Sequence, residues 1–264
     1  MYKMLNPDGV ERWQRRTTLQ IDMNRDALRL QCPESRILKN LQQTLKPLVG
    51  FNLHDQSPRY SVGNTKEVAA ISFLATAYNH ERTINSVRER AMQLIVGMVV
   101  SCKSLLPNQV ARYSDEFEPR AFGDNIAKWG TSLVLIESGG YKNDPEKQYL
   151  RKMNFIAILT SLVSIADGTY TRENHSEYEK IPQNERNHFD LIIRNARTNK
   201  MAKPSRWTLR SIAMKPPMPL PWALLTNRPS KTLATCRYSM ASKSSTQRAF
   251  LRDAKGSRCS SSRR

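Results

Sequence analysis

Several side chains in this sequence could together hydrolyse an amide bond. His54 and Glu137 each follow a short apolar run, and three arginines, Arg12, Arg15 and Arg16, lie near the start of the chain. Hydrolysis of an amide at neutral pH needs an activated water molecule, a base that accepts its proton and a positive charge that stabilises the oxyanion. A histidine that binds a metal, a glutamate and an arginine supply these functions in metal-dependent hydrolases.

A further pair, Asn24 and Arg25, suits the recognition of a free carboxylate. An arginine guanidinium pairs with a carboxylate through two parallel hydrogen bonds, and a neighbouring amide can fix the orientation of the bound group. The chain thus contains the groups with which an exopeptidase holds the free end of a peptide.

The order of the motifs that contain these residues is more specific than any motif alone. The motifs are NPDG at 6–9, RWQRRT at 12–17, IDMNRD at 21–26, LHDQ at 53–56 and LIESGG at 135–140. Each is weak by itself, but the five in this order resemble the downstream two-thirds of a zinc metallocarboxypeptidase catalytic domain. The resemblance covers roughly residues 4–166.

The resemblance implies a catalytic role for three residues. His54 would be the last of three ligands to one zinc ion, and Glu137 would be the general base that takes a proton from the metal-activated water. Arg15 would polarise the scissile carbonyl and stabilise the oxyanion. The implied activity is hydrolysis of the C-terminal peptide bond.

The resemblance also implies how the substrate is held. Asn24 and Arg25 would bind the terminal carboxylate, and Arg12 would be a secondary substrate contact. The implied partner is therefore a peptide with a free C-terminal carboxylate.

Two features depart from the family pattern. The first two zinc ligands of the family come from a His-x-x-Glu motif upstream of the NPDG turn, and only five residues precede Asn6. Because a catalytic zinc takes three protein ligands, we expect this chain to bind zinc weakly and to have little or no activity as given. The nearest candidate for the family's substrate-closing tyrosine is Tyr113, whose spacing to Glu137 does not match the family well.

These side chains also have structural explanations. A histidine at a strand end commonly forms a hydrogen bond within the fold, and Glu137 could pair with Lys128 or Lys142, since an unpaired carboxylate beside a buried layer costs free energy. The arginines fit a solvated turn, and Asn24 with Arg25 fits a cap. The ordered set of motifs favours the chemical interpretation.

Helices and strands must bring these side chains together, and the apolar pattern predicts both in alternation. It predicts helices over 33–46, 81–105 and 145–166, and strands over 48–53, 68–74 and 131–136. The predicted fold class is α/β, a three-layer α/β/α sandwich with a mixed, mostly parallel sheet that is incomplete at its N-terminal side. Because functional groups gather beyond strand ends in such sheets, His54 and Glu137 should share one edge.

Charge divides the chain into parts. Residues 196–264 contain 16 of the 42 lysines and arginines but only one of the 23 acids, Asp253, although the whole chain has a net charge of +19. We expect a catalytic-domain part over 1–166, a connecting segment over 167–195 and a basic, poorly ordered tail over 196–264. The basic composition therefore characterises the tail.

The tail has three interpretations. It is a basic arm that binds nucleic acid through salt-sensitive phosphate contacts, a linker, or the product of a change of reading frame between about 194 and 200. The last is favoured because acids almost vanish after FDLIIRN, a segment that resembles the start of another ordered element. Nucleic acid is expected as a partner only through this tail.

Two other functions remain open. One is an amidohydrolase of the same fold that acts on small acyl-amino acids, and the other is a non-catalytic basic protein that binds nucleic acid.

The four cysteines lack the spacing of a zinc site or of a disulfide framework, and no run of about 18 apolar residues predicts a membrane span. The localisation stays open, and a secreted or periplasmic parent would carry its export signal upstream.

Overall fold

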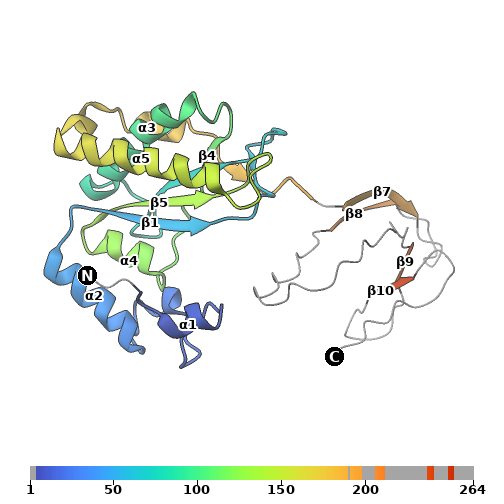
Figure 1. Cartoon of the computed structure of the whole chain (residues 1–264), viewed down its shortest axis with the longest axis horizontal. Coiled ribbons are helices and arrows are strands. Elements are labelled where there is room, and N and C mark those ends of the chain that lie inside the picture. The colour runs from blue at the N-terminus through green and yellow to red at the C-terminus, as the bar shows by residue number, and fades with distance from the viewer. Residues whose placement is uncertain (1–3, 190, 198–205, 212–236, 241–248, 253–264) are drawn as a thin grey trace. The chain divides into compact units, whose positions relative to one another are not determined.

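The computed structural model describes residues 4–189, 191–197, 206–211, 237–240 and 249–252 (Figure 1). The chain divides into two compact units, Met1–Ala213 and Met214–Arg264. In the second unit, the described strands β9 (Arg237–Met240) and β10 (Ala249–Arg252) pair antiparallel. Most of the predicted basic tail over 196–264 lies outside the described residues, as do residues 198–200 of the predicted frame change near 194–200.

A four-stranded sheet forms the centre of the first unit. Its order is β1 (Val49–Asp55), β5 (Ser132–Ser138), β3 (Ile71–Ala75) and β4 (Val110–Arg112). The pairs β1 with β5 and β3 with β4 are parallel, whereas β3 with β5 is antiparallel. The prediction of an α/β fold with a mixed, mostly parallel sheet is confirmed.

Helices lie on both faces of this sheet (Figure 1). The long helices α3 (Ser86–Lys103) and α5 (Gln148–Ala166) share one buried apolar cluster with the sheet, to which β3 and β5 contribute alternate residues. The short helix α4 (Phe122–Lys128) covers the opposite face, where Gly123 lies against Asn52 and Leu133. On this side lie also α1 (Pro7–Glu11) and α2 (Pro33–Leu45).

Smaller elements complete the first unit. They are η1 (Met23–Arg25), β2 (Ser61–Val62), η2 (Thr169–Arg172), α6 (Ser176–Glu179), β6 (Asn184–Glu185), β7 (Leu191–Arg197) and β8 (Arg206–Ser211). Strands β2 and β6 pair antiparallel, as do β7 and β8. Strand β7 crosses the predicted boundary between the connecting segment and the tail.

The NPDG motif, expected as a turn, begins a helix. Asn6 is the N-cap of α1, and its Oδ1 accepts a hydrogen bond of 3.1 Å from the backbone N–H of Gly9. Pro7 occupies the first helical turn, where its missing N–H would have no helical partner in any case. The same four residues that form a turn signal are thus also an N-terminal helix signal.

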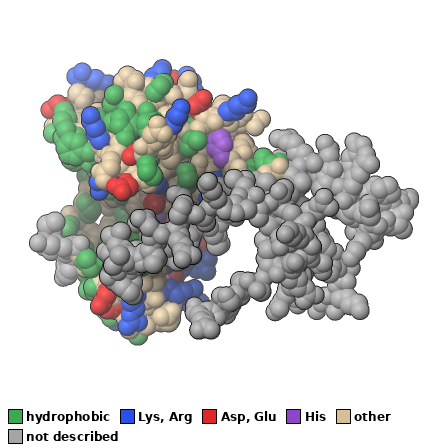
Figure 2. Space-filling model, turned by 45° about the vertical axis from the view of Figure 1, so that its right-hand side comes forward, with side chains coloured by type: hydrophobic (Ala, Val, Ile, Leu, Met, Phe, Trp, Pro, Cys, Tyr) green, Lys and Arg blue, Asp and Glu red, His purple; other side chains and the backbone are tan. Residues whose placement is uncertain are grey.

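Helix α5 is apolar on nearly all sides. By length and composition alone its 19 residues would suffice to cross a membrane, and 22% of the apolar stretch is buried. The sequence predicted no such span. Leu150 and Met153 are fully buried in the core cluster, whereas Phe155 and Leu159 are exposed. Figure 2 shows hydrophobic side chains gathered on the upper, helical part of the molecule. Helices packed inside a protein have a similar composition, so this finding assigns no membrane role.

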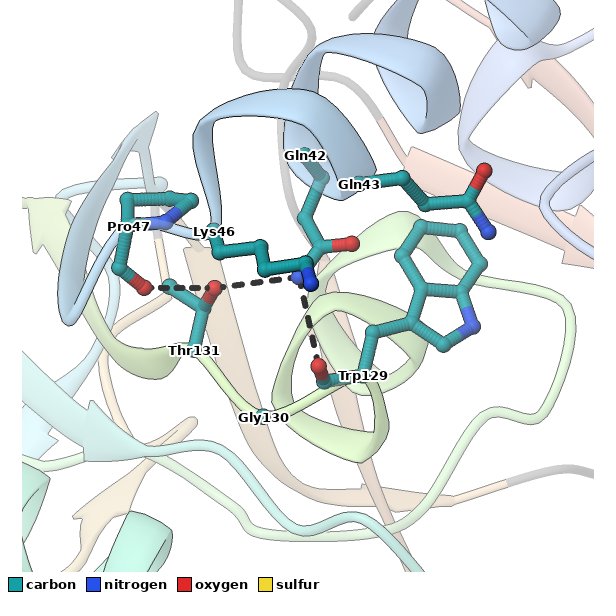
Figure 3. Close-up of a pocket in the computed structure, with 7 residues that line it drawn as sticks. All are labelled: Gln42, Gln43, Lys46, Pro47, Trp129, Gly130 and Thr131. Atoms are coloured by element: carbon teal, nitrogen blue, oxygen red, sulfur yellow. Dashed lines mark hydrogen bonds between the residues drawn. The ribbon is translucent and has the colours of Figure 1, made fainter.

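A hollow of about 440 Å³ lies where β1 and β5 begin, at the end of these strands away from His54 and Glu137 (Figure 3). Gln42 of α2 donates hydrogen bonds of 3.3 Å to the Trp129 carbonyl and to Thr131 Oγ1. Thr131 Oγ1 in turn donates to the Pro47 carbonyl at 2.9 Å. These bonds join α2 to the segment between α4 and β5.

The replacement Gln42→Leu is expected to lower the free energy of unfolding by about 1–3 kcal/mol, because it leaves the Trp129 carbonyl without this donor in a largely buried place. Urea denaturation of the full chain measures the loss. The matched control is Gln43→Leu, since Gln43 is the next residue of the same helix, lines the same hollow and is exposed. Equal losses in the two variants would show that these hydrogen bonds do not contribute.

Candidate active site

Strand register brings His54 and Glu137 together. In the parallel pair of β1 with β5, His54 is the direct partner of Glu137. Side chains alternate along a strand, and Asn52 and Leu133 face α4, so His54 and Glu137 point to this face as well. The two residues expected at one sheet edge are therefore neighbours, although both lie within their strands and not just beyond them.

Glu137 has an unusual environment for a carboxylate. It is 7% exposed, and no hydrogen bond or ion pair of its side chain is found within the described part of the chain, including to Lys128 or Lys142. Burial, with a smaller contribution from the negative charge of Asp55, raises the pKa of Glu137 to about 7, while Lys147 acts in the opposite direction. A carboxylate that titrates near neutral pH suits a general base.

Lys147 ties together the ends of the two strands that carry these residues. Its Nζ forms an ion pair with Asp55 at the end of β1 and donates to the Ser138 carbonyl of β5 at 2.8 Å. It also contacts the Gln56 carbonyl at 3.3 Å. The backbone of Lys147 adopts the left-handed conformation, with φ of 57°, which is uncommon for a residue other than glycine. No motif in the sequence indicates a role for this residue.

The environment of His54 favours a neutral imidazole. Burial lowers the pKa of His54, and the positive charge of Arg15 lowers it further. Arg15 is therefore close enough for its charge to act on the imidazole. Its guanidinium is largely exposed, and its Nε donates to Asp22 Oδ2 at 2.7 Å. This bond links Arg15 to the segment that contains Asn24.

Asn24 and Arg25 lie on η1, next to the start of α4. Asn24 Oδ1 accepts a hydrogen bond of 2.9 Å from the backbone N–H of Phe122. Arg25 Nη1 donates to the Asn24 carbonyl at 2.6 Å. Because α4 covers the face to which His54 points, these contacts put η1 on the same side of the sheet as the candidate base.

Arg12 has no side-chain contact that joins it to the candidate site within the described residues. It is exposed at the C-cap of α1, and no hydrogen bond or ion pair of its side chain occurs among the residues that the structure describes. Arg16 binds the Gln20 carbonyl at 2.7 Å, also in an exposed position. The structure therefore groups Arg15, but neither Arg12 nor Arg16, with His54.

Tyr113 lies close enough to Glu137 for the charge of this carboxylate to act on its phenol. Burial raises the pKa of the Tyr113 phenol, and the charge of Glu137 raises it further. The backbone N–H of Tyr113 donates to the Phe73 carbonyl at 2.8 Å, and its ring lies 6.5 Å from that of Tyr60 between centroids. Tyr113 follows β4, and the position of β4 beside β3 is a tertiary feature that spacing along the chain does not reveal.

Among the described residues, no group of three or more histidine, cysteine, aspartate or glutamate side chains that could hold a metal ion is found. The carboxylate next to His54 in sequence, Asp55, is paired with Lys147. Since a catalytic zinc takes three protein ligands, a zinc ion bound to His54 would need two further ligands.

Comparisons with family models, with curated proteins and with solved structures returned no match.

Proposed function

We propose that this chain is the downstream part of a zinc metallocarboxypeptidase catalytic domain, which in complete form hydrolyses the C-terminal peptide bond of a peptide. The observation that carries the proposal is the pairing of His54 with Glu137 in adjacent strands, where the positive charge of Arg15 also acts on His54. These are residue types that a metal-dependent hydrolase needs, and the pKa of Glu137, about 7, suits proton transfer at neutral pH.

The catalytic roles proposed here are those of the chain's own side chains. Glu137 accepts a proton from the attacking water, and its burial keeps it basic enough to do so near neutral pH. Arg15 stabilises the negative charge that develops on the carbonyl oxygen. Tyr113 lies on the Glu137 side of the sheet and contacts the bound substrate.

The terminal carboxylate of the substrate binds to Asn24 and Arg25. The Oδ1 of Asn24 is occupied by the Phe122 N–H, which leaves the Asn24 amide nitrogen as a donor for a ligand. Arg25 is the cationic partner, and its side chain is 39% exposed. An amide donor beside a guanidinium orients a carboxylate as well as neutralising it.

The complete domain would extend the present structure in two ways. Two further ligands would join His54 at the metal, and without them we expect weak zinc binding and little or no hydrolysis. Further strands would join the sheet at β1, an outer strand in the described residues, and complete a three-layer α/β/α sandwich. An open sheet edge of this kind favours association with other chains.

Carboxylate recognition can be tested on the chain as it exists. We expect N-acetyl-leucine to bind to the full chain and N-acetyl-leucinamide to bind at least about tenfold more weakly, because a charge-assisted hydrogen-bond pair contributes about 1.5–3 kcal/mol. Arg25→Met should remove the preference for the acid. Ligand-detected NMR at several ligand concentrations measures the dissociation constants.

The matched control is Arg151→Met, which removes an exposed arginine from α5 on the other face of the sheet. This variant should keep the preference of the unaltered chain. Equal binding of acid and amide, or an acid preference that survives Arg25→Met, would overturn the proposal.

A further inference from the structure

The segment between β4 and α4 places a carboxylate of the protein itself on Arg25. Glu118 Oε2 lies 3.3 Å from Arg25 Nε. We propose that Glu118 occupies Arg25 in the free protein as an internal competitor of the substrate's terminal carboxylate, and so regulates binding. This inference rests on the proposed role of Arg25 as the carboxylate receptor.

The guanidinium of Arg25 is already engaged on both of its useful edges. A carboxylate that binds an arginine through two hydrogen bonds uses either the two Nη atoms or Nε with one Nη. Nη1 donates to the Asn24 carbonyl at 2.6 Å, and Nε faces Glu118. A bound terminal carboxylate must therefore displace one of these two contacts.

The contact with Glu118 is the weaker of the two. At 3.3 Å it is an ion pair between partly exposed side chains, and such pairs contribute little to stability in water. The bond to the Asn24 carbonyl is short and closes between adjacent residues. Glu118 is therefore displaced from Arg25 when a substrate carboxylate forms two hydrogen bonds with the guanidinium.

A second arginine keeps Glu118 neutralised after it leaves Arg25. Arg120 Nε donates to Glu118 Oε1 at 2.9 Å, and Arg120 Nη2 donates to Oε2 at 2.8 Å. These bonds lower the pKa of Glu118 to about 2, so that the side chain is a carboxylate throughout the neutral range. Glu118 is thus shared between two guanidinium groups, of which only Arg25 belongs to the proposed substrate site.

Two backbone contacts hold this segment in addition to the Glu118 carboxylate, whose Oε1 also accepts a hydrogen bond of 3.2 Å from the Arg120 N–H. A glutamine at this position keeps an oxygen that can accept the same bond. The Glu118 N–H donates to Asp124 Oδ1 at 3.0 Å, and the Ala27 N–H donates to the Arg120 carbonyl at 3.1 Å. Removal of the Glu118 charge should therefore leave the segment in place beside η1. A change in ligand affinity then reports on competition and not on a displaced loop.

The test uses the full chain and N-acetyl-leucine as the probe, with dissociation constants from ligand-detected NMR. Glu118→Gln is expected to tighten binding about twofold to fivefold, since it removes both a competing and a repelling charge. Glu116→Gln is the matched control, because Glu116 is an exposed acid two residues away and its loss changes the net charge equally. It should leave the affinity unchanged.

Arg120→Met supplies a variant with the opposite expected sign. Without Arg120, Glu118 has Arg25 as its only cationic partner in the described residues, and probe binding should weaken. In the double variant with Glu118→Gln, the loss of Arg120 should have no effect. A loss that persists in the double variant would mean that Arg120 itself binds the probe.

The outcomes separate this inference from the proposed function. If Arg25→Met leaves the acid preference intact, the proposed site is wrong and the competitor role is excluded with it. If binding depends on Arg25 but Glu118→Gln weakens it, then Glu118 orients Arg25 and does not compete. Equal tightening by Glu116→Gln would reduce the effect to net charge and overturn the proposal.

Discussion

Replacing Arg88 with methionine is expected to lower the free energy of unfolding by about 3 kcal/mol. The Arg88 side chain is 2% exposed, and its Nη2 lies 2.7 Å from Asp115 Oδ2. Its Nε donates to the Ala75 carbonyl at 3.2 Å, and its Nη1 contacts the Arg82 carbonyl. Methionine fills a similar volume but supplies no donor, so Asp115 loses its buried partner.

The expected loss of stability in Arg88→Met lies at the lower end of the range for breaking a buried ion pair, because Asp115 keeps a second partner. Arg82 Nη1 lies 3.2 Å from Asp115 Oδ1, and the Arg82 side chain is 56% exposed. The control Arg82→Met should therefore cost no more than about 1 kcal/mol. Urea denaturation of both variants makes the comparison. If the two losses are equal, the Arg88 bonds do not anchor the segment that carries Tyr113 and Glu118.

The long elements could be read from the sequence because their apolar patterns are strong. Helices α2, α3 and α5 and strands β1, β3 and β5 were predicted within a few residues of their observed ends. Short elements were missed. Strand β4 has three residues, too few for any alternation, and α4 has a glycine near its start and no side-chain hydrogen bond at its N-cap. Its helical form depends on tertiary packing against β1 and β5.

Part of the candidate site was also predictable. His54 and Glu137 each end an apolar run, which places both near strand ends, and parallel pairing makes those ends coincide. The contribution of Tyr113 was not predictable, because it depends on which strand lies next to β3. Nor were the contacts of Lys147 with Asp55 and of Glu118 with Arg25, since each joins segments distant in sequence and neither residue forms part of a recognisable motif.

The stability of the protein should fall as the pH rises from about 4.5 to about 7, and Glu137 should be a major cause. In the unfolded chain its pKa is near the ordinary value of 4.5, whereas burial raises it to about 7 in the folded protein. The folded state therefore binds this proton more tightly. The resulting stabilisation is complete below about pH 4.5 and is lost between there and pH 7, by about 3 kcal/mol in total.

Other groups titrate in neighbouring ranges, so a variant must isolate this contribution. Burial raises the pKa of Asp124 to about 6, which adds a loss of the same sign at lower pH. The lowered pKa of His54 acts in the opposite direction below 6.5, because a buried neutral imidazole favours the folded state at higher pH. These groups are present in both proteins when the unaltered chain is compared with Glu137→Gln.

We expect Glu137→Gln to reduce the loss of stability between pH 5 and pH 7.5 by about 2–3 kcal/mol, since glutamine has no proton to lose. Urea denaturation at several pH values measures this difference, and Glu67→Gln, at an exposed glutamate, is the matched control. Parallel pH curves for the unaltered chain and Glu137→Gln would mean that Glu137 has an ordinary pKa. A carboxylate that is fully ionised below pH 5 would be a weaker base, and the assignment of Glu137 as the proton acceptor would then fail.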